Sequence, residues 1–395
     1  MLKDKCIILG VTGSIAAYKI ASLASRLKKD GADVHVIMTE NATNFINPIT
    51  FETLTGNKCL VDTFDRDFEF SVEHVSLGQA ADVMLVAPAT ANVIAKMAHG
   101  IADDMLTTTV LSTTAPIIVS PAMNTRMYEK PVTQDNIARL REYGMTVIDP
   151  AEGYLACGDI GAGKMPEPED LYDEICFAIG HERILAGKKV IVTAGPTREA
   201  VDPVRFLTNH STGRMGYALA QAAAICGAEV TLVSGPVEIP VPAHVKVVDI
   251  SSAADMYDAV SAEFDDADIL IGAAAVADYR PADVSGEKIK KSDSDMSIKM
   301  ERTTDILGTL AAKKDHRFIC GFSMETENVL VNSRDKLLRK NFDMIVANDL
   351  REPGAGFGVP TNVVTIITEK DETHLPLLTK DEVAFEILER IAKAL

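Results

Sequence analysis

The chain has 395 residues, 47% of them hydrophobic, so it is long enough for two or three domains with buried cores. Its net charge of −18 argues against duplex DNA or RNA as a partner, because binding a phosphate backbone needs a surplus of Lys and Arg. No apolar run approaches the roughly 20 residues that span a bilayer, and the N-terminus lacks a signal-peptide pattern. We therefore expect a cytoplasmic protein with neither a nucleic-acid nor a membrane partner.

The chain consists of two similar halves. Residues 5–39 predict a buried strand, a glycine-containing turn, an amphipathic helix and a second strand, and residues 188–235 repeat this plan with a long insertion after the first strand. Each half later has an apolar strand that runs into a small-residue loop, at 81–92 and 267–278. Apolar strands that alternate with helices indicate parallel sheets covered on both faces. We predict an α/β protein of two Rossmann-like domains, 1–183 and 184–395, each a mostly parallel sheet with helices on both faces.

The first turn, GVTGS, places Gly10 and Gly13 between strand and helix, with Ser14 opening the helix. Backbone N–H groups at such a turn point at an anion, although a tight turn with a serine cap gives the same pattern. A complete G-x-G-x-x-G is absent, so the turn favours a mononucleotide phosphate over a dinucleotide.

Three further residues of the first half are candidates for chemistry. His74 falls in an alternating segment, where a lone histidine is usually structural. Asn124 ends the apolar strand PIIVS in the sequence PAMN, where its amide could hold a carboxylate. Cys157 lies in a glycine-flanked loop, which is unusual for a thiol that only packs a core. The six cysteines form no C-x-x-C pair, so neither a disulfide framework nor a zinc knuckle is indicated.

The stretch GDIGAGKM, residues 158–165, has the G-x-x-x-x-G-K pattern of a phosphate-binding P-loop. Met165 cannot ligate Mg²⁺ as a hydroxyl would, no apolar strand leads into the stretch, and Pro166 and Pro168 argue against a long helix after it. We interpret it as a mobile flap that carries the thiol of Cys157.

In the second half, a long loop after the first strand carries Arg198, Arg205 and Arg214 and would suit phosphate or carboxylate, although a charge-balanced surface loop is the alternative. Lysines also gather around Lys288, in a chain that is otherwise acidic. Lys336 and Lys340 lie four residues apart, on one helical face, which is more favourable when an anion lies between them.

Together the motifs of residues 1–180 resemble the flavin-dependent cysteine decarboxylases, specifically 4′-phosphopantothenoylcysteine decarboxylase. The resemblance rests on GVTGSIAAYK, the HVSL around His74, APATANVIAKMAHGIADD, PAMN and ACGDIGAGKM. It implies a flavodoxin-like homo-oligomer that oxidises the substrate's thiol, releases CO₂ and returns a hydride. His74 would assist the oxidation, Asn124 would orient the carboxylate and Cys157 would supply a proton. The FMN would be bound by Gly10, Gly13, Ser14, Thr39, Ala89, Thr90 and Asn92.

Residues 188–395 resemble phosphopantothenate–cysteine ligase, through TAGPTRE, DPVRF, NHSTGRMG, AAAVADYRP and EKIKK. The resemblance implies that CTP and Mg²⁺ convert the substrate's carboxylate into an acyl-cytidylate, from which cysteine displaces CMP. Lys288 would offset charge at the transferring phosphate, Asn209 would act on the acyl-cytidylate, and Arg205 and Asn209 would hold the substrate. The family's Asn-Pro-Asp-Ile is replaced by Thr303, Thr304, Asp305 and Ile306. The nucleotide would contact Gly272, Ala273, Ala274, Asp278, Lys288, Thr304, Asp305, Ile306, Leu307, Phe322, Lys336 and Lys340.

The leading hypothesis is therefore a bifunctional coenzyme A biosynthesis enzyme acting on 4′-phosphopantothenate, cysteine and CTP. A NAD-linked oxidoreductase of tandem Rossmann-like domains is the alternative, but neither half has a full G-x-G-x-x-G followed by an acidic residue. A non-catalytic flavin-binding regulator is a third hypothesis, and the joint presence of the candidate catalytic residues argues against it.

Overall fold

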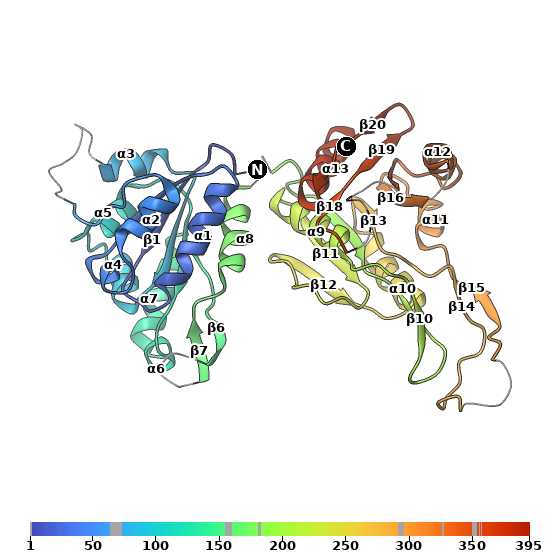
Figure 1. Cartoon of the computed structure of the whole chain (residues 1–395), viewed down its shortest axis with the longest axis horizontal. Helices are drawn as coiled ribbons and strands as arrows, with labels where there is room; N and C mark the ends of the chain where they lie inside the picture. Colours follow the sequence, from blue (N-terminus) through green and yellow to red (C-terminus); the bar gives the residue numbers. More distant parts are fainter. Residues whose placement is uncertain are drawn as a thin grey trace. The chain divides into compact units, whose positions relative to one another are not determined.

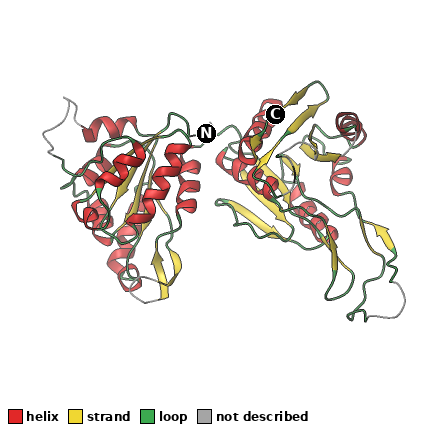
Figure 2. Cartoon of the chain, viewed as in Figure 1, coloured by secondary structure: helices red, strands yellow, loops and turns green. Residues whose placement is uncertain are grey.

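A computed structural model describes residues 2–63, 73–154, 160–180, 183–290, 296–325, 328–349, 354, 356 and 358–395. These residues form two compact units, Met1–Ile179 and Gly180–Leu395, whose helices and strands are labelled in Figure 1. Both units consist of a mostly parallel sheet with helices on its faces, as Figure 2 shows, so the predicted fold class is confirmed. None of the helices in the described part of the chain is long and apolar enough to cross a membrane.

The sheet of the first unit is parallel throughout and has the strand order β2-β1-β3-β4-β5, which is the flavodoxin-like order. The strand order reverses between β1 and β3, so a ligand site is expected there, beyond the carboxyl ends of the strands. The strands are β1 (Cys6–Val11), β2 (Asp33–Met38), β3 (Val83–Ala89), β4 (Ile117–Pro121) and β5 (Thr146–Val147).

Helices cover both faces of this sheet. One core joins the sheet to apolar side chains of α4, α5 and α7, while α1 and α8 pack together and against the other face. In α1 the buried residues Ile20, Leu23 and Leu27 recur at helical spacing. The helices are α1 (Ala17–Lys29), the 3₁₀-helix η1 (Glu40–Asn44), α2 (Pro48–Thr55), α3 (Glu73–Ala80), α4 (Ala91–His99), α5 (Met105–Ser112), α6 (Thr125–Tyr128), α7 (Pro131–Glu142) and α8 (Pro168–Ile179).

The stretch that resembled a P-loop forms part of an antiparallel ribbon, in which β6 (Ala151–Tyr154) pairs with β7 (Ile160–Lys164). Gly163 and Lys164 of the pattern therefore lie in a strand, and not in a loop between strand and helix, while Gly158 lies outside the described residues. The expectation that no long helix follows was wrong: α8 begins at Pro168, because proline needs no N–H donor in the first turn of a helix.

The sheet of the second unit has the order β12-β11-β8-β13-β16-β17-β19-β20. Its first six strands are parallel and wind as 3-2-1-4-5-6, the dinucleotide-binding order, with the reversal between β8 and β13. Two antiparallel strands complete the edge. The strands are β8 (Lys189–Ala194), β11 (Glu229–Ser234), β12 (Val245–Asp249), β13 (Ile269–Gly272), β16 (Phe318–Glu325), β17 (Met344–Asp349), β19 (Val364–Thr368) and β20 (Glu372–His374).

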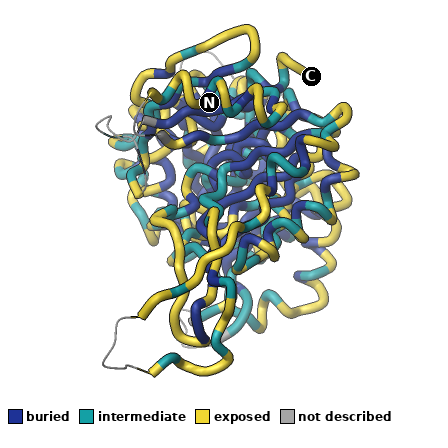
Figure 3. The backbone as a smooth tube through the Cα atoms, turned by 90° about the vertical axis from the view of Figure 1, so that its right-hand side faces the viewer, coloured by how far each residue is buried: buried dark blue, intermediate teal, exposed yellow. Residues whose placement is uncertain are grey.

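One core of the second unit packs α10, α11 and α12 against the sheet, and α13 packs on α9. Figure 3 shows the buried strands of the interior and the exposed loops around them. The helices are α9 (Arg214–Ile225), α10 (Ala253–Phe264), α11 (Ile306–Ala311), α12 (Val329–Arg339) and α13 (Lys380–Ala394), and a further short pair joins β18 (Thr361–Asn362) to β21 (Leu378–Thr379).

The long insertion after β8 is not an unstructured loop. It contains an antiparallel hairpin of β9 (Arg198–Ala200) and β10 (Phe206–Thr208), and a second ribbon joins β14 (Tyr279–Pro281) to β15 (Met300–Arg302). β13 stops at Gly272, so Asp278 lies in the loop that precedes β14 and not at the end of a strand.

Candidate functional sites

The first unit has a cavity of about 470 Å³ beyond the carboxyl ends of β1, β2 and β3. Four of the residues predicted to bind a cofactor line it, namely Gly13, Thr39, Thr90 and Asn92. Thr39 is buried, and its Oγ1 has no hydrogen-bond partner among the described residues, so it is available to a ligand. The other lining residues are Glu40, Asn41, Ala91, Val93, Lys96, Asp103, Asp104 and Met127.

Gly10, Ser14 and Ala89 are not among the described residues that line this cavity. Gly10 serves packing, because a Cβ there would lie 2.5 Å from Leu106 Cδ1. The prediction that Ser14 opens the helix was wrong: α1 begins at Ala17, and Ser14 Oγ accepts a hydrogen bond from the N–H of Ala16 at 3.3 Å.

Thr12 joins the two strands on either side of the reversal and was missed by sequence reasoning. Its buried Oγ1 donates to the carbonyl of Pro88 at 2.5 Å and accepts from the N–H of Thr90 at 3.1 Å. Thr90 in turn caps α4 by accepting from the N–H of Val93. The loop after β3 is therefore held by Thr12, the residue that follows β1. In the sequence, only the position of Thr12 at the end of a strand could have indicated this role.

Charged side chains on the wall of the first cavity bind one another. Lys96 donates to Asp103 at 2.6 Å and to Asp104 at 3.1 Å, and the hydrogen bond to Asp103 raises the pKa of Lys96. Asp104 also caps α5 through the N–H of Thr107. Burial opposes ionisation of Asp104, yet its hydrogen bonds with Thr107 and Lys96 lower its pKa, so the carboxylate stays charged.

The three candidate catalytic residues of the first half are placed differently. Asn124 caps α6 by accepting from the N–H of Arg126 at 2.9 Å, and the neighbouring N–H of Met123 donates to Gly163 of β7 at 3.1 Å. His74 lies in helix α3 and not in an alternating segment. Neither is among the described lining residues of the cavity, and Cys157 lies outside the described residues.

The second unit also has a cavity of about 470 Å³, beyond the carboxyl ends of β13 and β16. Ten of the residues predicted to bind a nucleotide line it: Gly272, Ala274, Asp278, Thr304, Asp305, Ile306, Leu307, Phe322, Lys336 and Lys340. Val276, Tyr279, Arg302, Thr303 and Phe342 also line it and were not predicted. Residues from four separate segments of the second half, 272–279, 302–307, 322 and 336–342, therefore line one cavity.

Two lysines of this cavity are held by the protein. Lys336 donates to the carbonyl of Phe322 at 3.0 Å, and Lys340 pairs with Asp305 at 2.7 Å. Asp305 also caps α11 through the N–H of Gly308 at 3.1 Å. Burial disfavours the charged form of Asp305, but Lys340 and this N–H together lower its pKa.

Thr193 of the second unit, like Thr12 of the first, forms a hydrogen bond to the loop that follows the neighbouring strand. It lies near the carboxyl end of β8, and its Oγ1 accepts from the N–H of Ala274 at 3.2 Å. The N–H of Ala273 donates to the carbonyl of Thr193, and Ala273 is not among the described lining residues.

Two of the remaining candidates, Arg205 and Lys288, lie near a buried carboxylate, Asp202. It accepts from the N–H groups of Val204, Arg205 and Ile289 at 2.8, 2.9 and 3.1 Å, and it pairs with the guanidinium of Arg205 at 2.8 Å. Arg205 also donates to the carbonyl of Ile289, so Asp202 and Arg205 fix the segment that carries the exposed Lys288.

Asn209 is placed near the cavity wall but not on it. Its amide donates to the carbonyl of Ala275 at 3.0 Å, within the loop that follows β13. Arg205, Asn209 and Lys288 are not among the described residues that line the second cavity. The structure thus connects Asn209 to one end of the loop and Arg205 to the Lys288 segment.

Residues 1–180 match the family described as Flavoprotein, and residues 185–395 match the DNA/pantothenate metabolism flavoprotein C-terminal domain. The chain is 48% identical to the coenzyme A biosynthesis bifunctional protein CoaBC of Bacillus subtilis (strain 168), over 99% of this chain and 98% of that protein. It is 44% identical to the protein of the same name in Escherichia coli (strain K12), over 99% and 97%. A crystal structure of the C-terminal domain of such a protein is 46% identical, covering 54% of this chain and 97% of that one with a TM-score of 0.47.

Proposed function

Since the chain belongs to the CoaBC family of bifunctional coenzyme A biosynthesis proteins, we propose that it joins 4′-phosphopantothenate to cysteine and then decarboxylates the product. The observation that carries this proposal is the 48% identity over nearly the whole chain, in a protein whose two units each have a cavity beyond the carboxyl ends of their parallel strands. Nothing in these comparisons supports the NAD-linked alternative.

The first unit would bind FMN. Three features suit this cofactor: a cavity of about 470 Å³, the hydroxyl of Thr39 with no partner among the described residues, and a glycine, Gly13, on the cavity wall. A glycine there lets the backbone approach a phosphate closely. When bound, the flavin supplies a two-electron oxidant for the substrate's thiol, without which loss of CO₂ would leave an unstabilised carbanion.

The substrate of the decarboxylation would contact residues that are not among the described lining residues of that cavity. We propose that Asn124 orients the carboxylate that is lost, that His74 assists removal of protons in the oxidative half, and that Cys157 returns a proton to the product. Asn124 is already fixed as the cap of α6, which restricts its amide to one direction. A homo-oligomer that completes this site belongs to the same proposal.

The second unit would activate 4′-phosphopantothenate. Its carboxylate attacks the α-phosphate of CTP, which releases pyrophosphate and leaves an acyl-cytidylate, and the amine of cysteine then displaces CMP to form the amide. This chemistry brings two anions together, so cations must offset their repulsion. Lys336, Lys340 and Lys288 would meet the triphosphate, with Mg²⁺ as its counter-ion, while Asn209 and Arg205 would position the acyl group.

One assay tests both activities. The purified protein is mixed with 4′-phosphopantothenate, cysteine, CTP and Mg²⁺, and CO₂ and CMP are measured. We expect both products. Cys157→Ser should abolish CO₂ and keep CMP, whereas Lys288→Ala should lower CMP formation roughly 10²- to 10³-fold, the usual loss for one transition-state contact.

The Lys288→Ala variant also provides the reciprocal control. It should release CO₂ at the wild-type rate when it is given 4′-phosphopantothenoylcysteine, and Lys290→Ala, a nearby exposed lysine, should change neither activity. A protein that forms no CMP from this mixture, a Cys157→Ser variant that loses both products, or a Lys288→Ala variant that releases no CO₂ from 4′-phosphopantothenoylcysteine would contradict two separate sites.

A further inference from the structure

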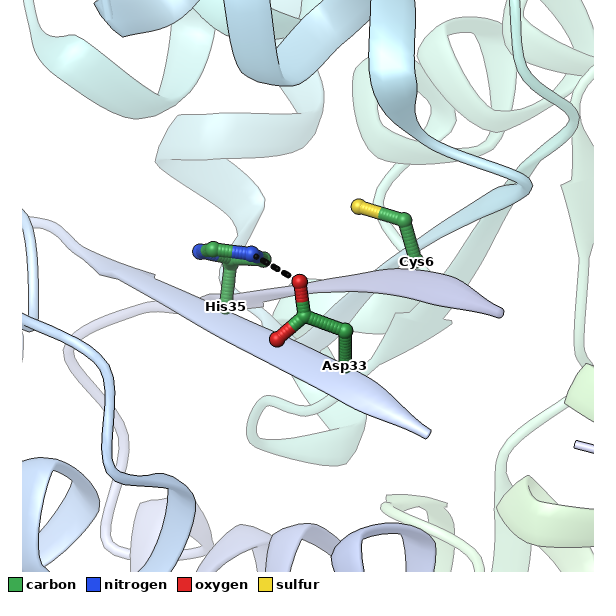
Figure 4. Close-up of side chains that lie close together, drawn as sticks. All are labelled: Cys6, Asp33 and His35. Carbon is green, nitrogen blue, oxygen red and sulfur yellow. Dashed lines mark hydrogen bonds and ion pairs between the residues drawn. The ribbon is translucent and has the colours of Figure 1, made fainter. Parts of the chain in front are cut away.

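A cysteine, an aspartate and a histidine lie together at the amino ends of β1 and β2. Cys6 is the first residue of β1 and is paired in register with Asp33, the first residue of β2. His35 follows two positions later, so its side chain lies on the same face of the sheet as that of Asp33. Figure 4 shows the three side chains converging, and their ligand atoms all lie within 4.8 Å of one another.

The cluster is oriented by hydrogen bonds from residues around it. His35 Nε2 lies 3.0 Å from Asp33 Oδ2, and the other carboxylate oxygen of Asp33 accepts from the amide of Asn57 at 2.9 Å. The hydrogen bond from Asn57 lowers the pKa of Asp33, which keeps this carboxylate ionised. The N–H of Cys6 donates to Asp82 at 2.8 Å, which fixes the start of β1. Partners of this kind hold the ligands in place at many metal sites.

We propose that Cys6, Asp33 and His35 bind one divalent transition-metal ion of the zinc class, with water as the fourth ligand. Thiolate, imidazole and carboxylate are the three side-chain ligands that zinc prefers, and tetrahedral zinc separates a nitrogen from an oxygen ligand by about 3.4 Å. The distance of 3.0 Å between His35 Nε2 and Asp33 Oδ2 would need to increase only slightly, and the metal would take the place of the proton between these two atoms.

This site is separate from the proposed flavin site. β1 has six residues, so Cys6 and the carboxyl end of the strand lie about 16 Å apart. β2 is the edge strand of the sheet, and Cys6 and Asp33 belong to adjacent strands. A metal ion here would link β2 to β1 and would stabilise the first unit without taking part in either reaction.

Metal binding must displace the proton of the thiol. Burial, with the carboxylates of Asp33 and Asp82, raises the pKa of Cys6 to about 11. Asp82 is itself paired with Lys5 at 3.0 Å, and the positive charge of Lys28 is a further cause of the lowered pKa of Asp33. The thiol proton is therefore released when the metal ion binds.

The experiment uses the full-length protein after treatment with a chelator, titrated with Co²⁺ and then with Zn²⁺. We expect one Co²⁺ per chain with a thiolate-to-cobalt charge-transfer band, and Zn²⁺ should displace the Co²⁺ and raise the melting temperature. Cys6→Ser should remove the charge-transfer band, and His35→Gln should weaken Co²⁺ binding at least tenfold. His316→Gln, which alters the exposed Asp315–His316 pair at 3.5 Å without a cysteine beside it, should leave the titration unchanged.

Two results would overturn the proposal directly. These are the absence of a charge-transfer band at stoichiometric Co²⁺, and a band that persists in Cys6→Ser. To separate loss of the site from loss of the fold, the titration of His35→Gln is compared with its circular dichroism spectrum. Wild-type-like secondary structure together with unchanged Co²⁺ affinity would exclude the site. All of these readouts are independent of CO₂ and CMP formation.

Discussion

The two cavities have similar volumes and both lie beyond the carboxyl ends of parallel strands, but their charges differ. The described wall of the first has one cation, Lys96, against the carboxylates of Glu40, Asp103 and Asp104. The described wall of the second has three cations, Arg302, Lys336 and Lys340, against two carboxylates, Asp278 and Asp305. A cofactor with a single phosphate can be held by the backbone N–H groups of a turn, whereas a triphosphate requires cationic side chains.

The largest expected effect concerns a lysine of the second cavity. Lys336→Ala removes a half-buried cation, and loss of a charged hydrogen bond of about 1.5–3 kcal/mol should raise the KM for CTP roughly 10- to 100-fold. The measurement is CMP release as a function of CTP concentration. FMN content, read from the flavin absorbance, should not change.

Arg339→Ala is the matched control for that prediction. Arg339 is exposed in the last turn of the same helix and is not among the described lining residues, so its loss changes the net charge equally. If both variants raise the KM to the same extent, then the overall charge of α12 attracts CTP, and the contrast between the two cavities would not depend on their walls.

The architecture of both units could be predicted from the sequence because it rests on local patterns. Apolar strands such as residues 6–11 and 189–194 and the glycine turns that follow them are contiguous in the chain. Ten of the residues predicted to contact a nucleotide line the second cavity, and all ten fall in recognisable motifs. Thr12, Thr193 and Asp202 could not be found this way, because their roles depend on partners about 80 residues away.

Side-chain pairing explains the other omissions. The hydrogen bonds of Lys96 to Asp103 and Asp104 join a helix to the loop that follows it, and no motif marks them as a unit. The proximity of Cys6 to Asp33 depends on the register of two parallel strands, which the sequence does not specify. The helix after Pro168 was excluded because the proline was read as a helix breaker, although its position is the first of the helix.

Substitutions of Thr12 and Thr193, which lie next to the strand-order reversals, test whether both units are stabilised by the same kind of hydrogen bond from a threonine to a loop. Thr12→Val keeps the shape but removes a donor to Pro88 and an acceptor for Thr90, which should cost about 1–3 kcal/mol in the free energy of unfolding of the first unit. Thr193→Val removes only the acceptor for Ala274 and should cost about 0.5–1.5 kcal/mol in the second unit.

The readouts of these two variants are separable. Heat-induced release of flavin fluorescence follows the first unit, and the KM for CTP follows the second. Thr12→Val should lower the temperature of flavin release and leave the KM for CTP unchanged, and Thr193→Val should do the reverse. A variant that affects both readouts would mean that the units do not behave independently.

The smallest expected effect concerns the ion pair of Asp305 with Lys340. Asn caps a helix as well as Asp does, so Asp305→Asn keeps the bond to Gly308 and loses only a partly exposed ion pair, which contributes about 0.2–1 kcal/mol.

The pH dependence of this effect follows from the lowered pKa of Asp305. The carboxylate stabilises the fold above its unfolded pKa of about 3.9, and that contribution is lost as the pH falls through the lower folded value. Faster amide hydrogen exchange in α11 of the variant at pH 7 should therefore converge with the wild type as the pH falls below about 4. Asp335→Asn, an exposed aspartate of α12, should behave as the wild type at both pH values. A difference for Asp305→Asn that persists in acid would mean that the carboxylate acts through its cap geometry and not through the charge of Lys340.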